Sequence, residues 1–262
     1  AKIIHIDIDP AELDKIKIAH IGISADVREA LGRLLPAVVA NQRTEWQQRV
    51  NTLKAENPFQ MADIDNPLSH FGLIRTVAAC LDDEATIATD VGQHQMWVAQ
   101  AYPLRRPRQW LTSGGLGTMG FGVPAAIGAA LAEPQRTVVC FTGDGSILMN
   151  IQELVTAAEE KVNLKIVLMD NATLGLVHQQ QTLFYGERLF ASQFKASPDF
   201  VKVAQGFGIA AIDLDQAANP CAALMEAINR PGPCLIHASI DADQKVYPMV
   251  PPGAANRNMI GA

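Results

Sequence analysis

Short apolar segments alternate with amphipathic ones along most of this chain. From Pro67 onward the pattern predicts strands over residues 85–89, 137–142, 164–169 and 234–239. Helices are predicted over residues 68–81, 93–100, 119–131, 151–161, 199–206 and 217–229. Because these strands are apolar throughout and helices separate them, we expect an α/β fold, with a mostly parallel sheet covered by helices on both faces. Ligands of such sheets bind at the carboxyl ends of the strands.

The first 66 residues have a different organisation. Residues 2–8 read as a buried strand, Asp9-Pro10-Ala11-Glu12 as a helix start, residues 19–24 as a second strand and residues 26–40 as an amphipathic helix. We interpret residues 1–40 as the tail of a second α/β domain whose upstream half is missing. Residues 41–66 read as a connecting helix and linker, so the main domain is predicted over 67–262.

Composition narrows the class of protein. The chain is 48% hydrophobic and 18% charged, enough to bury a large core, and its net charge of −6 argues against a nucleic-acid partner. The most apolar stretch, residues 120–132, is too short to span a membrane. The cysteines lie far apart in apolar segments without a CxxC pair, which predicts buried, reduced thiols in a cytoplasmic protein: Cys80, Cys140, Cys221 and Cys234.

The strongest chemical signal joins two predicted strand ends. One strand runs into Gly143-Asp144-Gly145-Ser146, and the next ends at Asp170-Asn171. Glycines allow close backbone approach, a helix start offers N–H groups to a phosphate, and Asp144, Asn171 and the Thr173 carbonyl could hold Mg²⁺. A tight turn with an N-capping Asp is the alternative reading of the tripeptide.

A second glycine motif supports a different reading. Residues 115–120, Gly-Leu-Gly-Thr-Met-Gly, formally match the GxGxxG motif of dinucleotide-binding folds, and Asp144 could then be the acidic residue that contacts the ribose. The flanking glycines of Asp144 suit a metal and a phosphate better than a ribose. A nicotinamide-dependent dehydrogenase therefore stays open as a remote alternative.

The spacing of 27 residues between Asp144 and Asn171 resembles the thiamine-diphosphate binding motif, a Gly-Asp-Gly followed by an Asn-Asn pair. Here Asp170 replaces the first Asn of the pair, which is not the metal ligand. The runs 90–97 (DVGQHQMW) and 113–128 (SGGLGTMGFGVPAAIG) resemble acetohydroxyacid synthase, also called acetolactate synthase. The resemblance covers essentially the whole chain and corresponds to the carboxyl-terminal half of the large subunit.

This resemblance implies a set of site residues. Gly92, Gln93 and His94 would lie against the diphosphate, the Gly117 carbonyl would accept from the aminopyrimidine, and Met119 would support the bent cofactor. Asp144, Asn171 and Thr173 would be the metal ligands. The full set implied for thiamine diphosphate is Gly92, Gln93, His94, Gly117, Met119, Gly143, Asp144, Gly145, Ser146, Asn171, Thr173, Gly175 and Leu176.

The opening segment resembles the end of the family's central domain, where FAD binds. The residues that this likeness points to are His5, Asp7, Asp9, Asp26 and Val27. A cap on the following helix is an equally good reading of Asp9, and His5 reads better as a packing residue than as a ligand.

The resemblance also implies a transferase reaction. Pyruvate is decarboxylated on thiamine diphosphate, and the two-carbon unit is condensed with a second pyruvate or 2-ketobutyrate, the first common step of branched-chain amino acid biosynthesis. The activating glutamate is expected outside this chain, on a neighbouring subunit, which implies a homodimer; a small regulatory subunit is also expected. A catabolic, FAD-independent acetolactate synthase, another thiamine-diphosphate decarboxylase or oxidase, and a non-enzymatic fragment stay open.

One departure concerns substrate choice. Many family members carry Trp where this chain has Gln180, and the indole favours 2-ketobutyrate by filling space around its extra methyl group. A methylene in an apolar pocket is worth about 1–3 kcal/mol. We therefore expect only a weak preference for 2-ketobutyrate here.

Overall fold

The computed structural model describes residues 2–261. These residues form two compact units, Ala1–Gln60 and Met61–Ala262, and the division between them falls inside the stretch predicted as a linker. In the first unit, two parallel strands pair side by side and short helices follow. Its elements are β1 (Ile4–Asp7), η1 (Pro10–Glu12), β2 (Ile21–Ser24), α1 (Val27–Leu34), η2 (Leu35–Ala37) and α2 (Thr44–Glu56).

Two predictions for the first unit are wrong. The opening strand forms, but it is not buried, since the Ile4 side chain is 61% exposed and Ile8 is 71% exposed. The helix predicted over 26–40 ends at Leu34 and continues only as a short 3-10 turn. Pro36 explains the early end, because proline lacks an N–H for the helix and disfavours helical geometry at the residue before it.

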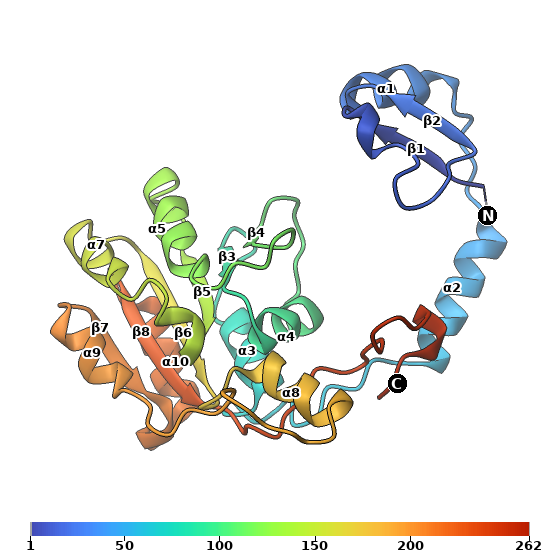
Figure 1. Ribbon diagram of the computed structural model, residues 1–262. Helices are drawn as coiled ribbons and strands as arrows, with labels where there is room; N and C mark the ends of the chain where they lie inside the picture. The colour runs from blue at the N-terminus through green and yellow to red at the C-terminus, as the bar shows by residue number, and fades with distance from the viewer. Residues whose placement is uncertain (1, 262) are drawn as a thin grey trace. The chain divides into compact units, whose positions relative to one another are not determined.

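The second unit is a six-stranded parallel sheet in the order β4-β3-β5-β6-β8-β7 (Figure 1). Every neighbouring pair of strands runs parallel, which confirms the predicted fold class. The strands are β3 (Thr86–Thr89), β4 (Trp110–Thr112), β5 (Val138–Gly143), β6 (Leu164–Asp170), β7 (Ala210–Asp213) and β8 (Cys234–Ser239).

Helices cover both faces of this sheet, so alternate residues of each strand enter two different cores. One face packs against α3 (His70–Ala79), α4 (Gln93–Ala101) and α10 (Pro220–Asn229). The other packs against α5 (Gly122–Ala132), α7 (Glu153–Glu159) and α9 (Phe200–Gly206), which lie together on one side in Figure 1. Three short helices complete the unit: α6 (Asp144–Ile147), α8 (Gly175–Phe184) and η3 (Leu214–Gln216); η4 (Asn256–Asn258) lies near the carboxyl end.

The sequence pattern missed several elements. Strands β4 and β7 have only three and four residues, too few to show a period. The alternation is also not strict, because α8 and α9 both lie between β6 and β7. Helix α5 begins three residues later than predicted, since Gly120 adopts a φ of 87° that ends the preceding turn. Helix α10 likewise begins at Pro220, where the Asn219 side chain caps it.

The thiols match their prediction only in part. Cys140 and Cys234 are buried and Cys80 is half-buried, but Cys221 is exposed on α10, so burial was wrongly predicted for it. All four are free. None of the helices built from residues 2–261 has the length and apolar character that a membrane span requires.

The buried strands dominate the stability of this unit, and Ile166→Ala tests this. Ile166 in β6 is fully buried in the core beneath α7 and α9. Its truncation should lower the free energy of unfolding by about 2–5 kcal/mol. Val155→Ala on α7 is the control, because Val155 is 52% exposed and its loss should cost at most about 0.5 kcal/mol. Equal losses in urea denaturation would contradict this account.

Candidate functional site

Three adjacent strands bring their carboxyl ends to one edge of the sheet. Thr89 pairs with Phe141 across β3 and β5, and Gly143 pairs with Met169 across β5 and β6. The segments that follow these strands therefore meet, although more than 80 residues of sequence separate the first from the last. They surround a cavity of about 230 Å³.

Every residue that the family resemblance implied for thiamine diphosphate lines this cavity. They are Gly92, Gln93, His94, Gly117, Met119, Gly143, Asp144, Gly145, Ser146, Asn171, Thr173, Gly175 and Leu176. The remaining lining residues, which the sequence analysis did not assign, are Val91, Trp97, Met169, Leu174 and Val177. Four of them are apolar and Trp97 has a single polar atom, so their chemistry gave no signal of a ligand site. Only their positions within or beside the motif segments could have indicated them.

Asp90, directly after β3, organises one wall of the site, and the sequence analysis gave it no role. Its buried carboxylate accepts the backbone N–H groups of Val91, Gly120 and Gly122 at 2.9, 2.7 and 3.2 Å. Burial raises the pKa of Asp90, and these donors act against that rise. The carboxylate thereby ties the 117–122 loop to the end of β3, which places Gly117 and Met119 at the cavity.

Asp144 has the properties of an unsatisfied cation ligand. It is the first residue of α6 rather than its N-cap, so the capping alternative does not describe it. Its Oδ1 atom accepts from the Gly145 N–H at 2.8 Å, whereas its Oδ2 atom is buried without a hydrogen-bond partner among the described residues. Burial, followed by the charge of Asp170, raises the pKa of Asp144 to about 7. A buried carboxylate with a free oxygen calls for a cation.

The turn after β6 supplies the neighbouring oxygens. Asn171 Oδ1 accepts from the backbone N–H and the hydroxyl of Thr173 at 3.2 and 3.0 Å. The intervening Ala172 has a left-handed φ of 53°, and Asp170 Oδ1 supports this turn by accepting the Ala172 N–H at 3.0 Å. Asn171 and Thr173 thus come from one tight turn, and both line the same cavity as Asp144.

Two further buried polar atoms of cavity-lining residues lack partners within residues 2–261. They are His94 Nε2 and Trp97 Nε1. Burial lowers the pKa of His94 to about 4, so its ring is neutral at pH 7. Unpartnered polar atoms are costly in a protein interior unless a ligand satisfies them. Together with Asp144 Oδ2, these atoms fit a site for a polar, anionic ligand and its cation.

Other sequence-predicted residues lie elsewhere. Gln180 is exposed on α8 and does not line the cavity. In the first unit, Asp9 and Asp26 each use one carboxylate oxygen to cap η1 and α1, as the capping alternative for Asp9 expected. His5 Nε2 lies 3.8 Å from Asp7 Oδ2, and Val27, the first residue of α1, is 57% exposed. These five residues belong to the first unit and not to the cavity.

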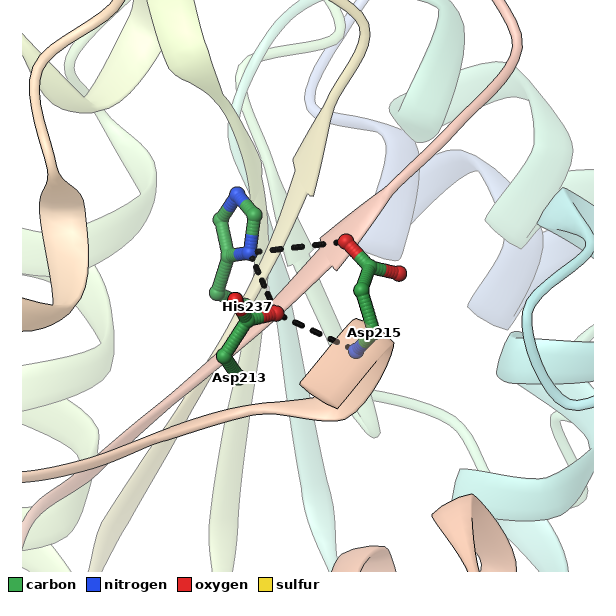
Figure 2. Close-up of side chains that lie close together, drawn as sticks. All are labelled: Asp213, Asp215 and His237. Carbon is green, nitrogen blue, oxygen red and sulfur yellow. Dashed lines mark hydrogen bonds and ion pairs between the residues drawn. The ribbon is translucent and has the colours of Figure 1, made fainter. Parts of the chain in front are cut away.

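A charged cluster stands behind the Asp170 turn. His237 in β8 contacts Asp170 Oδ2 through Nε2 at 3.3 Å, and its Nδ1 atom lies 3.1 Å from Asp213 Oδ1 and 3.9 Å from Asp215 Oδ2. Figure 2 shows this second ring nitrogen directed at both Asp213 and Asp215. The hydrogen bond that His237 donates to Asp170 and the adjacent negative charges raise the pKa of His237 to about 9, although burial opposes them.

The protonation of His237 decides what this cluster is. The ligand atoms of Asp213, Asp215 and His237 lie within 4.8 Å of one another, close enough for a shared metal ion. An imidazolium, however, carries hydrogen on both nitrogens and has no lone pair for a metal. Without a metal ion, the raised pKa leaves His237 protonated at neutral pH, and the cluster is then an ion-pair network in which His237 holds the carboxylate of Asp170.

The raised pKa of His237 predicts how stability depends on pH. Because the folded-state pKa lies above the unfolded value, the stabilisation is complete below pH 6.5 and is lost as the pH rises through about 9. The difference is on the order of 3 kcal/mol. In thermal unfolding, the native chain should therefore be more stable than His237→Gln at pH 6. The difference in stability between the two proteins should be smaller at pH 9.5. A gap that does not change with pH would refute the ion-pair network.

Comparison with known proteins agrees with this site. Residues 90–238 match the family model described as thiamine pyrophosphate enzyme, C-terminal TPP binding domain. The chain is 62% identical over 261 residues to the acetolactate synthase isozyme 1 large subunit of Escherichia coli (strain K12), covering 100% of this chain and 46% of that protein. It is 42% identical to the isozyme 2 large subunit of the same organism, over 99% of this chain and 47% of the relative.

A plant relative gives the same result. Acetolactate synthase 2, chloroplastic, of Zea mays is 41% identical over 273 residues, covering 99% of this chain and 43% of that protein. The chain thus spans about half the length of the curated relatives it matches. On these matches, the chain belongs to the acetolactate synthase large-subunit family and contains its C-terminal thiamine-pyrophosphate-binding domain.

Proposed function

We propose that this chain anchors thiamine diphosphate by its diphosphate group through a Mg²⁺ ion. The observation that carries the proposal is the buried, unpartnered Asp144 Oδ2 atom on the wall of the cavity. Mg²⁺ favours a few protein oxygens together with phosphate oxygens and water. Asp144, the Asn171 amide oxygen and the Thr173 carbonyl would supply the protein oxygens.

The other cavity residues would hold the diphosphate and the organic part of the cofactor. The backbone around Gly143, Gly145 and Ser146, at the start of α6, would offer N–H groups to the diphosphate. His94 would add a neutral polar contact beside it, and Gly117 and Met119 on the Asp90-supported loop would position the ring system. Bound thiamine diphosphate would supply the electron sink for decarboxylation of a 2-keto acid.

For the whole protein we propose the acetolactate synthase reaction, with pyruvate as the donor and pyruvate or 2-ketobutyrate as the acceptor. This chain's residues would bind and orient, which keeps the reacting groups together. A glutamate of a second subunit would activate the cofactor, and a small regulatory subunit would associate. A nicotinamide dehydrogenase is disfavoured, because Asp144 lines one cavity together with Asn171 and Thr173 and does not stand alone as a ribose ligand would.

We propose further that FAD binds to the first structural unit of the chain. One oxygen of Asp9 and one of Asp26 are committed to helix starts, which leaves the second oxygen of each carboxylate for a ligand. The family resemblance, not the geometry of these two residues, supports this assignment.

Calorimetric titration of the chain with thiamine diphosphate tests the proposed site. Binding is expected with Mg²⁺ and should be lost with excess chelator or in Asp144→Ala, because the anionic ligand of the cation is then missing. Ser239→Ala, at the exposed end of β8, is the control and should bind like the native chain. Binding that survives both chelator and Asp144→Ala would overturn the metal anchor.

The role of Gln180 can be tested in a longer protein that includes the amino-terminal half. Gln180 follows the cavity-lining Val177 by three residues on α8, so both lie on one side of the helix. Gln180→Trp should raise the preference for 2-ketobutyrate over pyruvate by roughly 10-fold or more, since an apolar methyl contact is gained. The ratio of the two products in a competition assay measures this. A native protein that already strongly favours 2-ketobutyrate would contradict the prediction.

A further inference from the structure

A chain of buried amide groups runs from the carboxyl-terminal segment to the predicted metal ligand Asn171. Gln179 on α8 is fully buried. It accepts the Val246 N–H at Oε1 (2.8 Å) and donates from Nε2 to the Val246 carbonyl at 3.0 Å. Gln93 donates from Nε2 to Gln179 Oε1 at 3.0 Å, and Asn171 donates from Nδ2 to Gln93 Oε1 at 3.0 Å.

The direction of this chain is fixed at its Val246 end. A backbone N–H can only donate and a carbonyl can only accept, so Gln179 cannot turn its amide over without losing both bonds. Gln93 must then point its Nε2 atom at Gln179, where it also donates to the Gln244 carbonyl at 2.9 Å. Its Oε1 atom is left for Asn171 Nδ2. The Asn171 oxygen consequently points to Thr173, from which it accepts two hydrogen bonds.

Gly175 shows how closely these groups are packed. A Cβ atom at this position would lie 2.0 Å from Gln93 Oε1 and 3.0 Å from Asn171 Nδ2. Only glycine leaves room for the contact between the two amides at the start of α8. The hydrogen-bonded chain of Gln179, Gln93 and Asn171, called the amide relay below, therefore depends on the local backbone as well as on the side chains.

We propose that Gln179 is a positioning residue, which sets the orientation of the Asn171 amide through Gln93 and so presents the Asn171 oxygen to the cation. Gln179 does not line the cavity and acts only through its neighbours. The effect on the cation rests on the proposed function; the orientation of the amides does not. The carboxyl-terminal segment around Val246 thereby becomes part of the cofactor site.

Three variants separate positioning from general stability. Gln179→Met removes the acceptor for Gln93, whereas Gln179→Glu keeps an acceptor for both Gln93 and Val246 in either protonation state. Gln109→Met is the matched control. Gln109 is also a buried amide that bonds backbone groups, accepting from the Arg105 N–H at 2.9 Å and donating to the Ala85 carbonyl at 3.3 Å, but none of its hydrogen bonds goes to Gln93 or Asn171.

The first measurement follows the side-chain amide of Asn171 by ¹⁵N NMR in the ligand-free chain, assigned by its loss in Asn171→Asp. Gln179→Met should move this resonance toward the position of a free amide, while Gln109→Met should leave it in place. The second measurement is the Mg²⁺ concentration that half-saturates thiamine diphosphate binding. This concentration should rise at least about tenfold in Gln179→Met, because loss of a residue that supports a metal ligand typically weakens metal affinity by that factor. It should change little in Gln179→Glu or Gln109→Met.

The outcomes are distinct. An Asn171 resonance that does not respond to Gln179→Met, or a Mg²⁺ requirement that rises equally in Gln109→Met, would overturn the positioning role. If the native chain binds no thiamine diphosphate although the resonance responds to Gln179→Met, then the proposed function fails and the amide relay stands.

Discussion

The parallel register of β3, β5 and β6 is the constraint on which the site depends. Each strand is buried on both faces, so a shift in register would disrupt the close packing of both cores. With this register fixed, the three segments that follow the strands must emerge at one edge of the sheet. Residues far apart in the sequence thus become neighbours without any contact of their own to bring them together.

Convergence of strand ends also gathers negative charge, and the protein balances each carboxylate differently. Asp90 is stabilised by three backbone N–H groups, so its charge serves to shape a loop. Asp170 is held by the His237 imidazolium, with Asp213 and Asp215 behind it. Of these carboxylates, only Asp144 keeps a buried oxygen without a partner among the described residues. This unequal distribution supports the proposal that Asp144 binds a cation.

The replacement of the motif's first Asn by Asp170 is understandable in these terms. An Asn at this position could support the turn at Ala172 without adding charge, whereas an Asp adds a carboxylate next to Asp144. The imidazolium of His237 compensates for that charge. His237 pairs with Leu168 in the sheet, two residues before Ser239, which pairs with Asp170. The presence of Asp170 in place of the motif's first Asn is therefore linked to His237, which is not part of the motif.

The sequence by itself determined the α/β class and the parallel sheet, because apolar periodicity is a local signal, and the family resemblance of its motifs implied thirteen of the cavity-lining residues. It could not determine the short strands β4 and β7, the exposure of β1 and Cys221, or the place of Gln180 outside the cavity lining, since these depend on what packs nearby. Only the tertiary structure decided the partners of Asp90, Asp170 and Gln179. Their hydrogen bonds join segments separated by tens of residues, and the physical reason is that burial forces each polar group to find a partner wherever the fold places one.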